Sequence, residues 1–205
     1  MKLQSLSLSL LGALIICACG QADNAKNDPN TSDATTVDNA MRNDTGATSN
    51  ITNNSATATV TLDSMDQNFA LKAASGSMAE IQMANMAMQN GSNERVKAFA
   101  SMMIRDHGKA SEELKAMAPT KSLTLPTQPM PEHMKHIDML KGKTGAAFDK
   151  TYMQHMVMAH QADIKEFQKA SGSAKDSSVK GFATRQLPVL RMHLDSAQAI
   201  SKIKM

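Results

Sequence analysis

Apolar side chains recur every three or four residues through the C-terminal two thirds of the chain, whereas residues 21–61 contain almost no large apolar residue. This spacing places side chains on one face of an α-helix. Asp63, Asn93 and Asp176 stand where helix caps are needed, and Gly91 ends the first apolar stretch. The pattern predicts four long helices and one short helix, over residues 63–91, 92–118, 132–140, 145–171 and 176–205.

The segment between the second and third long helices covers residues 118–145 and is rich in proline. Adjacent antiparallel helices need only a few connecting residues, so this length predicts a crossover. The chain has no Trp, one Tyr and five Phe, which favours closely packed helices over a β-sandwich or barrel. We therefore predict an all-α fold, a four-helix bundle with a long connection between helices 2 and 3.

The third long helix carries ionisable groups within its apolar stripe. Asp149 and His160 share a face with Tyr152, Met156 and Phe167. Burying such a group without a partner costs on the order of 1–3 kcal/mol, and more for a charge. Either a hydrogen-bonding side chain on a facing helix or a metal ion in the bundle must therefore meet these groups.

The other three long helices each place one ionisable group at the middle of the stripe, namely Glu80, His107 and His193. With His160 and Asp149 they form the candidate metal ligands, and copper, zinc or iron is the expected ion. Bundle cores commonly hold metals. The alternative is that these groups hydrogen-bond to one another around a buried water. The residues alone leave both interpretations open.

Methionine is abundant, with 18 residues, and the runs at 83–88 and 153–158 contain three each. Thioether sulfur prefers copper(I), so clusters of Met and His outside the cytoplasm suit copper handling. Methionine also fills irregular cores. Several of these methionines lie on the predicted core stripes, which favours the filling role.

The N-terminus has the features of a secretory signal. The apolar run at residues 3–16 is shorter than the roughly 20 residues of a membrane-spanning helix. The sequence ending at Cys19 resembles the lipobox of bacterial lipoproteins, in which that cysteine is lipidated, and Gly20 resembles an outer-membrane sorting signal. We expect a lipoprotein signal peptide at 1–18, with an ordinary signal peptide as the alternative.

Residues 19–61 are rich in Asn, Thr, Ser, Ala and Asp. Such a segment cannot bury enough surface to offset the entropy of ordering it. It predicts a disordered, lipidated tether with a root-mean-square span of roughly 35 Å. The helical domain then occupies residues 62–205, held by lipid on the outer membrane and facing the periplasm.

Several classes of function are not supported by the sequence. The formal net charge is +3 and no basic block is present, so we expect no nucleic-acid partner. Removal of Cys17 and lipidation of Cys19 would leave no thiol for catalysis or metal binding. Nothing resembles an activated nucleophile, a phosphate loop or a dinucleotide fingerprint, so an enzyme ranks third among the hypotheses.

The stripe residues also form a pattern that resembles a known family over residues 65–201. The matching positions include Phe69, Glu80, Asp106-His107, Phe148-Asp149, Tyr152, His160, Leu187-Pro188 and His193. The pattern resembles the bacterial domain-of-unknown-function 4142 family, which implies a ferritin-like bundle in secreted and outer-membrane proteins. The Glu-x-x-His pairs of true ferritins are absent, which weighs against ferroxidase chemistry. A second, weaker resemblance is to Met- and His-rich periplasmic bundles that bind copper.

The sequence therefore supports two hypotheses from different classes. In the first, a lipid-anchored, ferritin-like bundle binds a transition-metal ion and serves metal homeostasis or envelope stress protection. In the second, the chain is a non-catalytic envelope protein without a metal, whose buried polar residues fix helix register and which acts through a protein partner.

Overall fold

The computed structural model describes residues 61–203, and this part of the chain is helical without strands. The predicted signal peptide, Cys19 and the tether lie outside the described residues. The elements are α1 (Ser64–Asn90), α2 (Glu94–Met117), the 3-10 helix η1 (Ala118–Lys121), α3 (Pro131–Asp138), α4 (Gly145–Ser173) and α5 (Ser177–Ser201). The prediction of an all-α bundle is confirmed.

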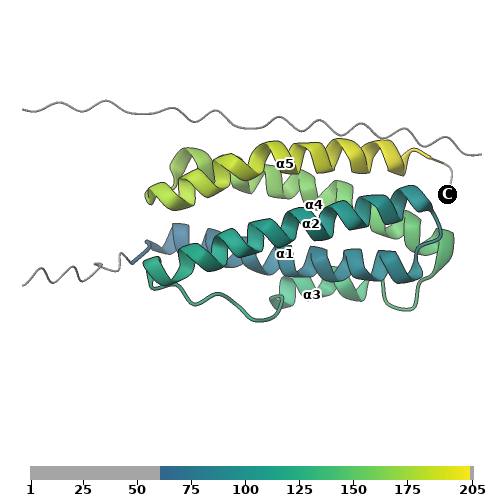
Figure 1. The fold of residues 1–205 in the computed structure, drawn as a ribbon, viewed down its shortest axis with the longest axis horizontal. Helices are drawn as coiled ribbons and strands as arrows, with labels where there is room; N and C mark the ends of the chain where they lie inside the picture. Colours follow the sequence, from purple (N-terminus) through teal and green to yellow (C-terminus); the bar gives the residue numbers. More distant parts are fainter. Residues whose placement is uncertain (1–60, 204–205) are drawn as a thin grey trace, which may run out of the picture. The chain divides into compact units, whose positions relative to one another are not determined.

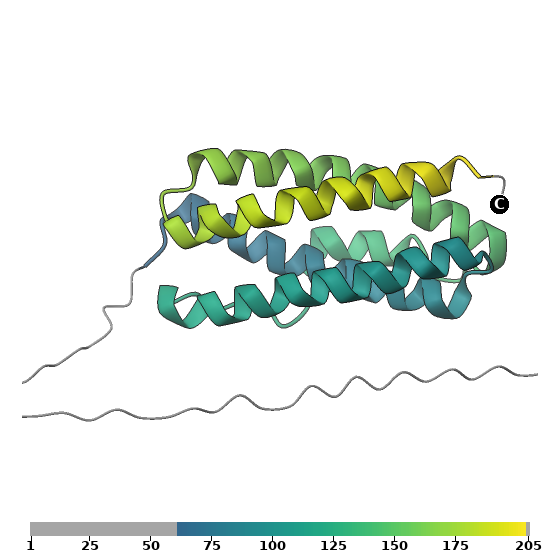
Figure 2. The same cartoon turned by 45° about the horizontal axis from the view of Figure 1, so that its top comes forward.

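The four long helices form two hairpins that pack side by side (Figure 1). α1 pairs with α2 and α4 with α5, and the hairpins meet through α1 with α4 and α2 with α5. α2 and α4 run in the same direction, so the chain must return along the bundle between them (Figure 2). η1 and α3 lie on this return path, where α3 packs on α1. The predicted crossover is therefore confirmed.

The predicted caps begin three of the long helices. Asp63 accepts a hydrogen bond from the Asp66 N–H at 2.9 Å, and Asn93 accepts one from the Arg95 N–H at 2.9 Å. Asp176 accepts from two backbone amides of the first turn of α5. These bonds satisfy amides that a helix N-terminus leaves free.

Two buried aspartates join the hairpins at opposite ends of the bundle. Asp66 on α1 accepts from the backbone amides of residues 175–176, in the α4–α5 turn, at 3.0 and 2.7 Å. Asp149 on α4 accepts from those of residues 92–93, in the α1–α2 turn, at 3.1 and 2.9 Å. α4 continues to Ser173, two residues beyond its predicted end at residue 171, and the turn that Asp66 holds follows it.

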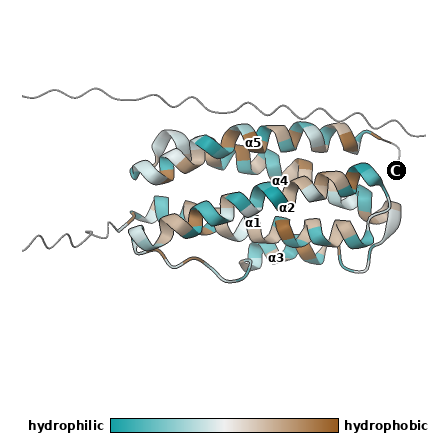
Figure 3. Ribbon diagram, in the orientation of Figure 1, coloured by the Kyte–Doolittle hydropathy of each residue, from teal (hydrophilic) through white to brown (hydrophobic). Residues whose placement is uncertain are grey.

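The interior has two hydrophobic clusters, one toward each end. One contains Phe99, Tyr152 and Met156, and the other contains Leu114 and Phe182. Hydrophilic and hydrophobic residues alternate along each long helix in Figure 3, as amphipathic helices require. None of the helices between residues 61 and 203 combines the length and hydropathy of a membrane span.

Candidate metal centre

Four ionisable side chains meet in a layer between the two hydrophobic clusters. Glu80 comes from α1, His107 from α2, His160 from α4 and His193 from α5. Their exposed fractions are 5%, 6%, 0% and 0%, respectively. The three histidines can each offer a nitrogen such that the three atoms lie within 4.8 Å of one another. The structure thus brings together the residues expected at the middle of each helix.

The tautomer of His160 follows from its backbone partner. Its Nδ1 atom lies 2.9 Å from the carbonyl oxygen of Met156, one turn earlier in α4. A carbonyl oxygen only accepts hydrogen bonds, so Nδ1 carries the proton. The Nε2 atom of the neutral ring is therefore left with a free lone pair.

The orientation of His193 follows from a carboxylate on α2. Its Nε2 atom lies 3.2 Å from Oδ2 of Asp106, which Arg105 also contacts at 2.9 Å. Burial opposes the charge of Asp106, but hydrogen bonds from Arg105 and His193 hold its pKa below the usual value. Asp106 is thus an ionised carboxylate, and it accepts a hydrogen bond from the Nε2–H group of His193. The lone pair of His193 is on Nδ1.

The two free lone pairs face each other. Nε2 of His160 and Nδ1 of His193 are 3.3 Å apart. Burial lowers the pKa of His160 to about 4 and also lowers that of His193, so both rings are neutral at pH 7. Because each ring already donates its one proton elsewhere, the two nitrogens face each other without a proton between them, an arrangement that a shared metal ion would stabilise.

His107 offers a third nitrogen without a partner. Its Nδ1 atom lies 3.2 Å from Oε2 of Glu80 and 3.5 Å from Oγ of Ser77. Its Nε2 atom is buried and has no hydrogen-bond partner among the described residues. Burial, with the nearby His160 and His193, lowers the pKa of His107 well below its usual value. A buried polar atom without a partner costs about 1–3 kcal/mol, so Nε2 is a candidate ligand atom.

Glu80 pairs with His107 and also approaches a second acidic residue. Its Oε1 atom is buried without a hydrogen-bond partner in the described structure and lies 3.7 Å from Nδ1 of His160. Burial and the charge of Asp163 raise the pKa of Glu80 well above its usual value. Burial and the charge of Glu166 raise the pKa of Asp163 to about 7.

Sequence reasoning missed Asp163 as a site residue. Glu80, His160 and Asp163 form a second group whose candidate ligand atoms lie within 4.8 Å of one another. His160 already uses Nδ1 to bind the Met156 carbonyl, which makes the group of three histidines the better donor set. The available signal was the position of Asp163, three residues after His160 on the same helix face.

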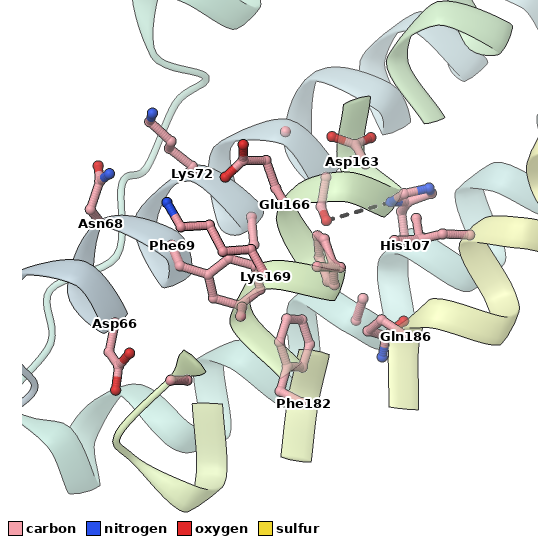
Figure 4. Close-up of a pocket in the computed structure, with 18 of the residues that line it drawn as sticks. Asp66, Asn68, Phe69, Lys72, His107, Asp163, Glu166, Lys169, Phe182 and Gln186 are labelled. Atoms are coloured by element: carbon pink, nitrogen blue, oxygen red, sulfur yellow. Dashed lines mark hydrogen bonds between the residues drawn. The ribbon is translucent and has the colours of Figure 1, made fainter. Parts of the chain in front are cut away.

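A cleft of about 180 Å³ connects this layer with the surface. Its lining includes the exposed Lys72 and Glu166 as well as the buried Glu80 and His107. In Figure 4, His107 and Lys72 lie at opposite sides of the cleft, and Asp163 lies between them. Of the three histidines in the layer, His107 lines this cleft, so the cleft leads from the surface to one of the candidate ligands.

Asp149 is not brought to this layer. It lies about three turns before His160 in α4, roughly 16 Å along the helix axis. Its carboxylate accepts a 2.7 Å hydrogen bond from the Ser92 hydroxyl in addition to the turn amides. A Cβ atom at Gly91 would lie 2.7 Å from Oδ1 of Asp149, so glycine makes room for this cap. Asp149 therefore links the hairpins instead of facing the histidines.

The methionine runs divide between the core and the surface. Met83, Met153 and Met156 are at most 1% exposed and belong to one hydrophobic cluster. Met88 and Met158 are 43% and 59% exposed. The buried methionines fill the core, as methionine commonly does, whereas the exposed methionines do not have this role.

The sequence matches the family model described as Domain of unknown function (DUF4142) over residues 52–200. No curated protein matches the chain at a significant level. Among solved structures, a DUF305 fragment from Deinococcus radiodurans is similar with a TM-score of 0.61 and 11% identity. The match covers 69% of this chain and 97% of the fragment.

Two structures of the protein CopM are also similar. The Cu(II)-bound form gives a TM-score of 0.57 at 17% identity, covering 67% of this chain and 95% of CopM. The Ag-bound form, obtained by co-crystallisation, gives a TM-score of 0.55 at 18% identity, covering 65% and 93%. At these identities the similarity concerns the fold.

Proposed function

We propose that this chain, which belongs to the family described as Domain of unknown function (DUF4142), binds one transition-metal ion through His107, His160 and His193. The ligand atoms are Nε2 of His107, Nε2 of His160 and Nδ1 of His193. This proposal applies to the helical domain and does not depend on how the protein is anchored.

The observation that carries the proposal is the contact between His160 and His193. Two nitrogens that each bind a tetrahedral ion at about 2.05 Å are about 3.3 Å apart. The observed separation of the two free nitrogens is 3.3 Å. This agreement between the two separations supports a metal ion shared by the two rings.

The outer nitrogen of each histidine supports the same assignment. Histidines that bind metals usually donate their other N–H to a carboxylate or a backbone carbonyl, which fixes the ring and its tautomer. Here Asp106 holds His193, the Met156 carbonyl holds His160, and Glu80 pairs with His107. In this arrangement Glu80 orients the metal ligand His107, whereas the sequence suggested that Glu80 itself binds the metal.

Copper(II) is the ion that we propose. It prefers tetragonal geometry, in which adjacent nitrogens at about 2.0 Å from the ion are about 2.8 Å apart, so we expect Nε2 of His160 and Nδ1 of His193 to approach each other by about 0.5 Å when it binds. Imidazole nitrogen suits copper, zinc, iron and nickel, and among the divalent first-row ions a given site binds Cu²⁺ most tightly. The similarity to CopM, whose structure is known in a Cu(II)-bound form, supports testing copper first. Together with the lipobox-like N-terminus, this points to a role in metal homeostasis at the cell envelope.

Titration of untagged protein with Cu(II) tests the proposal. We expect one tight equivalent and an electron paramagnetic resonance spectrum with nitrogen hyperfine structure. His160→Gln and His193→Gln should each weaken this binding sharply. His136→Gln is the matched control, because it removes a histidine outside the layer and should keep the tight equivalent.

Thermal melting separates the metal role from a purely structural one. A ligand at a hundredfold excess over its Kd stabilises the folded state by about 2.7 kcal/mol, so Cu(II) should raise the melting temperature of the wild type but not of His160→Gln. If the histidines only hydrogen-bond to one another, the metal-free variants should lose about 1–3 kcal/mol and no ion should shift the wild type. That second result would overturn the proposal.

A further inference from the structure

The six histidines of the chain fall into two groups of three. The second group, His133, His136 and His155, lines a cavity of about 420 Å³ bounded by α1, α4 and the region of α3. The same cavity is lined by three methionines, Met83, Met139 and Met158, and it borders the histidine layer through Glu80 and Asp163. This combination of imidazole and thioether groups takes no part in the centre proposed above.

His133 has a structural partner, which separates it from the other two. Its Nδ1 atom lies 2.6 Å from the Ser75 hydroxyl, which also accepts the backbone N–H of Met130 at 2.7 Å. These contacts fasten the start of α3 to α1. His133 therefore serves the docking of α3.

His136 and His155 are not engaged in this way. Their rings stack with centroids 4.5 Å apart and an interplanar angle of 30°. Neither ring makes a hydrogen bond to another described residue, although His155 is only 4% exposed. Two adjacent imidazoles thus border a cavity with their ring nitrogens uncommitted.

Each of these histidines has a methionine three residues later on the same helix face. His136 precedes Met139, which caps α3 in right-handed helical geometry, and His155 precedes Met158 on α4. Residues three apart are neighbours on a helical surface. Two His-x-x-Met pairs on different elements therefore line one cavity.

The exposure of the two methionines fits a ligand better than a core filler. Met139 is 39% and Met158 is 59% exposed. Single exposed apolar residues are common, and Met88 and Met192, both 43% exposed, are such cases because no histidine stands three residues before them. The His-x-x-Met spacing distinguishes Met139 and Met158 from these.

We propose that His136, Met139, His155 and Met158 form a second metal site that takes a soft monovalent ion, Cu(I) or Ag(I). Two imidazoles with two thioethers prefer such ions over hard divalent ones. The site is distinct from the centre of three histidines, which has nitrogen donors only. The two proposals therefore concern different residues and different oxidation states of copper.

Nuclear magnetic resonance of protein labelled with ¹³C at the methionine methyl groups tests this site directly. The chain from Cys19 onward is used, with Cys19 alkylated so that no thiol competes for silver. We expect one equivalent of Ag(I) to shift the methyl signals of Met139 and Met158 and to leave those of Met88 and Met192 in place. Unmoved Met139 and Met158 signals would overturn the proposal.

A pair of double variants provides the matched comparison. Met139→Leu with Met158→Leu should weaken Ag(I) binding at least tenfold in competition with a chelator, because leucine keeps the volume and removes sulfur. Met88→Leu with Met192→Leu should bind like the wild type. Equal affinity of both double variants would contradict the site.

The same variants distinguish this proposal from the first. Met139→Leu with Met158→Leu should keep the tight Cu(II) equivalent assigned to His107, His160 and His193. If Cu(II) binding were absent from the wild type while Ag(I) still shifted the two methionine signals, the first proposal would fail and the second would stand. The reverse result would leave only the histidine centre.

Discussion

The Nδ1 atom of His107 lies 3.2 Å from Oε2 of Glu80, between two hydrophobic clusters. Burial favours the neutral form of each group, raising the pKa of Glu80 and lowering that of His107. Burial therefore opposes a full ion pair between the carboxyl group and the imidazole. A metal ion bound to Nε2 of His107 would keep the ring proton on Nδ1. Glu80 accepts a hydrogen bond from this N–H group most strongly when it is ionised, so metal binding would favour the carboxylate form of Glu80.

We predict that Cu(II) binding at pH 7 releases about one proton, because metal loading and ligand-shell protonation are linked. Calorimetric titrations in buffers of different ionisation enthalpy measure this release. In Glu80→Gln the release should disappear and the affinity should fall 10- to 100-fold, as for other outer-shell partners. Asp149→Asn should change neither quantity. Undiminished proton release in Glu80→Gln would contradict the role of Glu80.

The metal-free protein should lose a stabilising contribution of His160 on acidification. The folded pKa of His160 is about 4, whereas a histidine in an unfolded chain titrates near 6.5. Between these pKa values the unfolded state binds more protons than the folded state. The contribution of His160 to the free energy of unfolding is therefore complete above pH 6.5 and is lost as the pH falls toward 4. Urea unfolding of wild type and His160→Gln should give stabilities that differ less at pH 4.5 than at pH 7. A constant difference would contradict the shift.

Asp163 should produce the opposite dependence. Its folded pKa is about 7, above the value of about 3.9 in an unfolded chain. Its contribution is therefore complete below pH 3.9 and is lost as the pH rises through 7, where this half-buried carboxyl group must ionise. The stability of Asp163→Asn relative to wild type should rise between pH 5 and pH 8 in urea unfolding. A relative stability that falls over this range would show that Asp163 is ionised in the folded protein.

Asp66 and Asp149, the two buried aspartates that join the hairpins, give a prediction about the stability of the metal-free protein. Asp66→Ala and Asp149→Ala should each lower the free energy of unfolding by about 2–3 kcal/mol, because each removes charged hydrogen bonds to turn amides. Asp138→Ala is the control, since the ion pair of Asp138 with Lys141 is exposed and worth less than about 1 kcal/mol. Cu(II) affinity should be unchanged in all three. A sharp loss of Cu(II) affinity in Asp149→Ala would return Asp149 to the ligand set.

Helical phase was sufficient to predict which faces meet. Glu80, His107, His160 and His193 were expected at the centre because each lies in the middle of an apolar stripe, and the structure brings them together. The crossover followed from the length of the proline-rich connection. These features depend on spacing along one helix or on chain length, which a sequence contains directly.

The position of a side chain along the bundle axis, relative to the neighbouring helices, was not predictable in the same way. Asp149 and His160 share a stripe, but phase does not show that Asp149 reaches the α1–α2 turn. The contact of Asp106 with His193 likewise depends on how far α2 is shifted against α5. Such shifts are set by packing between helices distant in sequence, which no spacing rule within one helix contains.

The reciprocal aspartates also bear on how the domain folds. Each hairpin leaves turn amides without partners until the other hairpin supplies its carboxylate. A hairpin that forms first must keep that turn solvated, so docking of the second hairpin completes both turns at once. The unit of cooperative folding is therefore the whole bundle, and hydrogen exchange at residues 92–93 and 175–176 should require separation of the two hairpins.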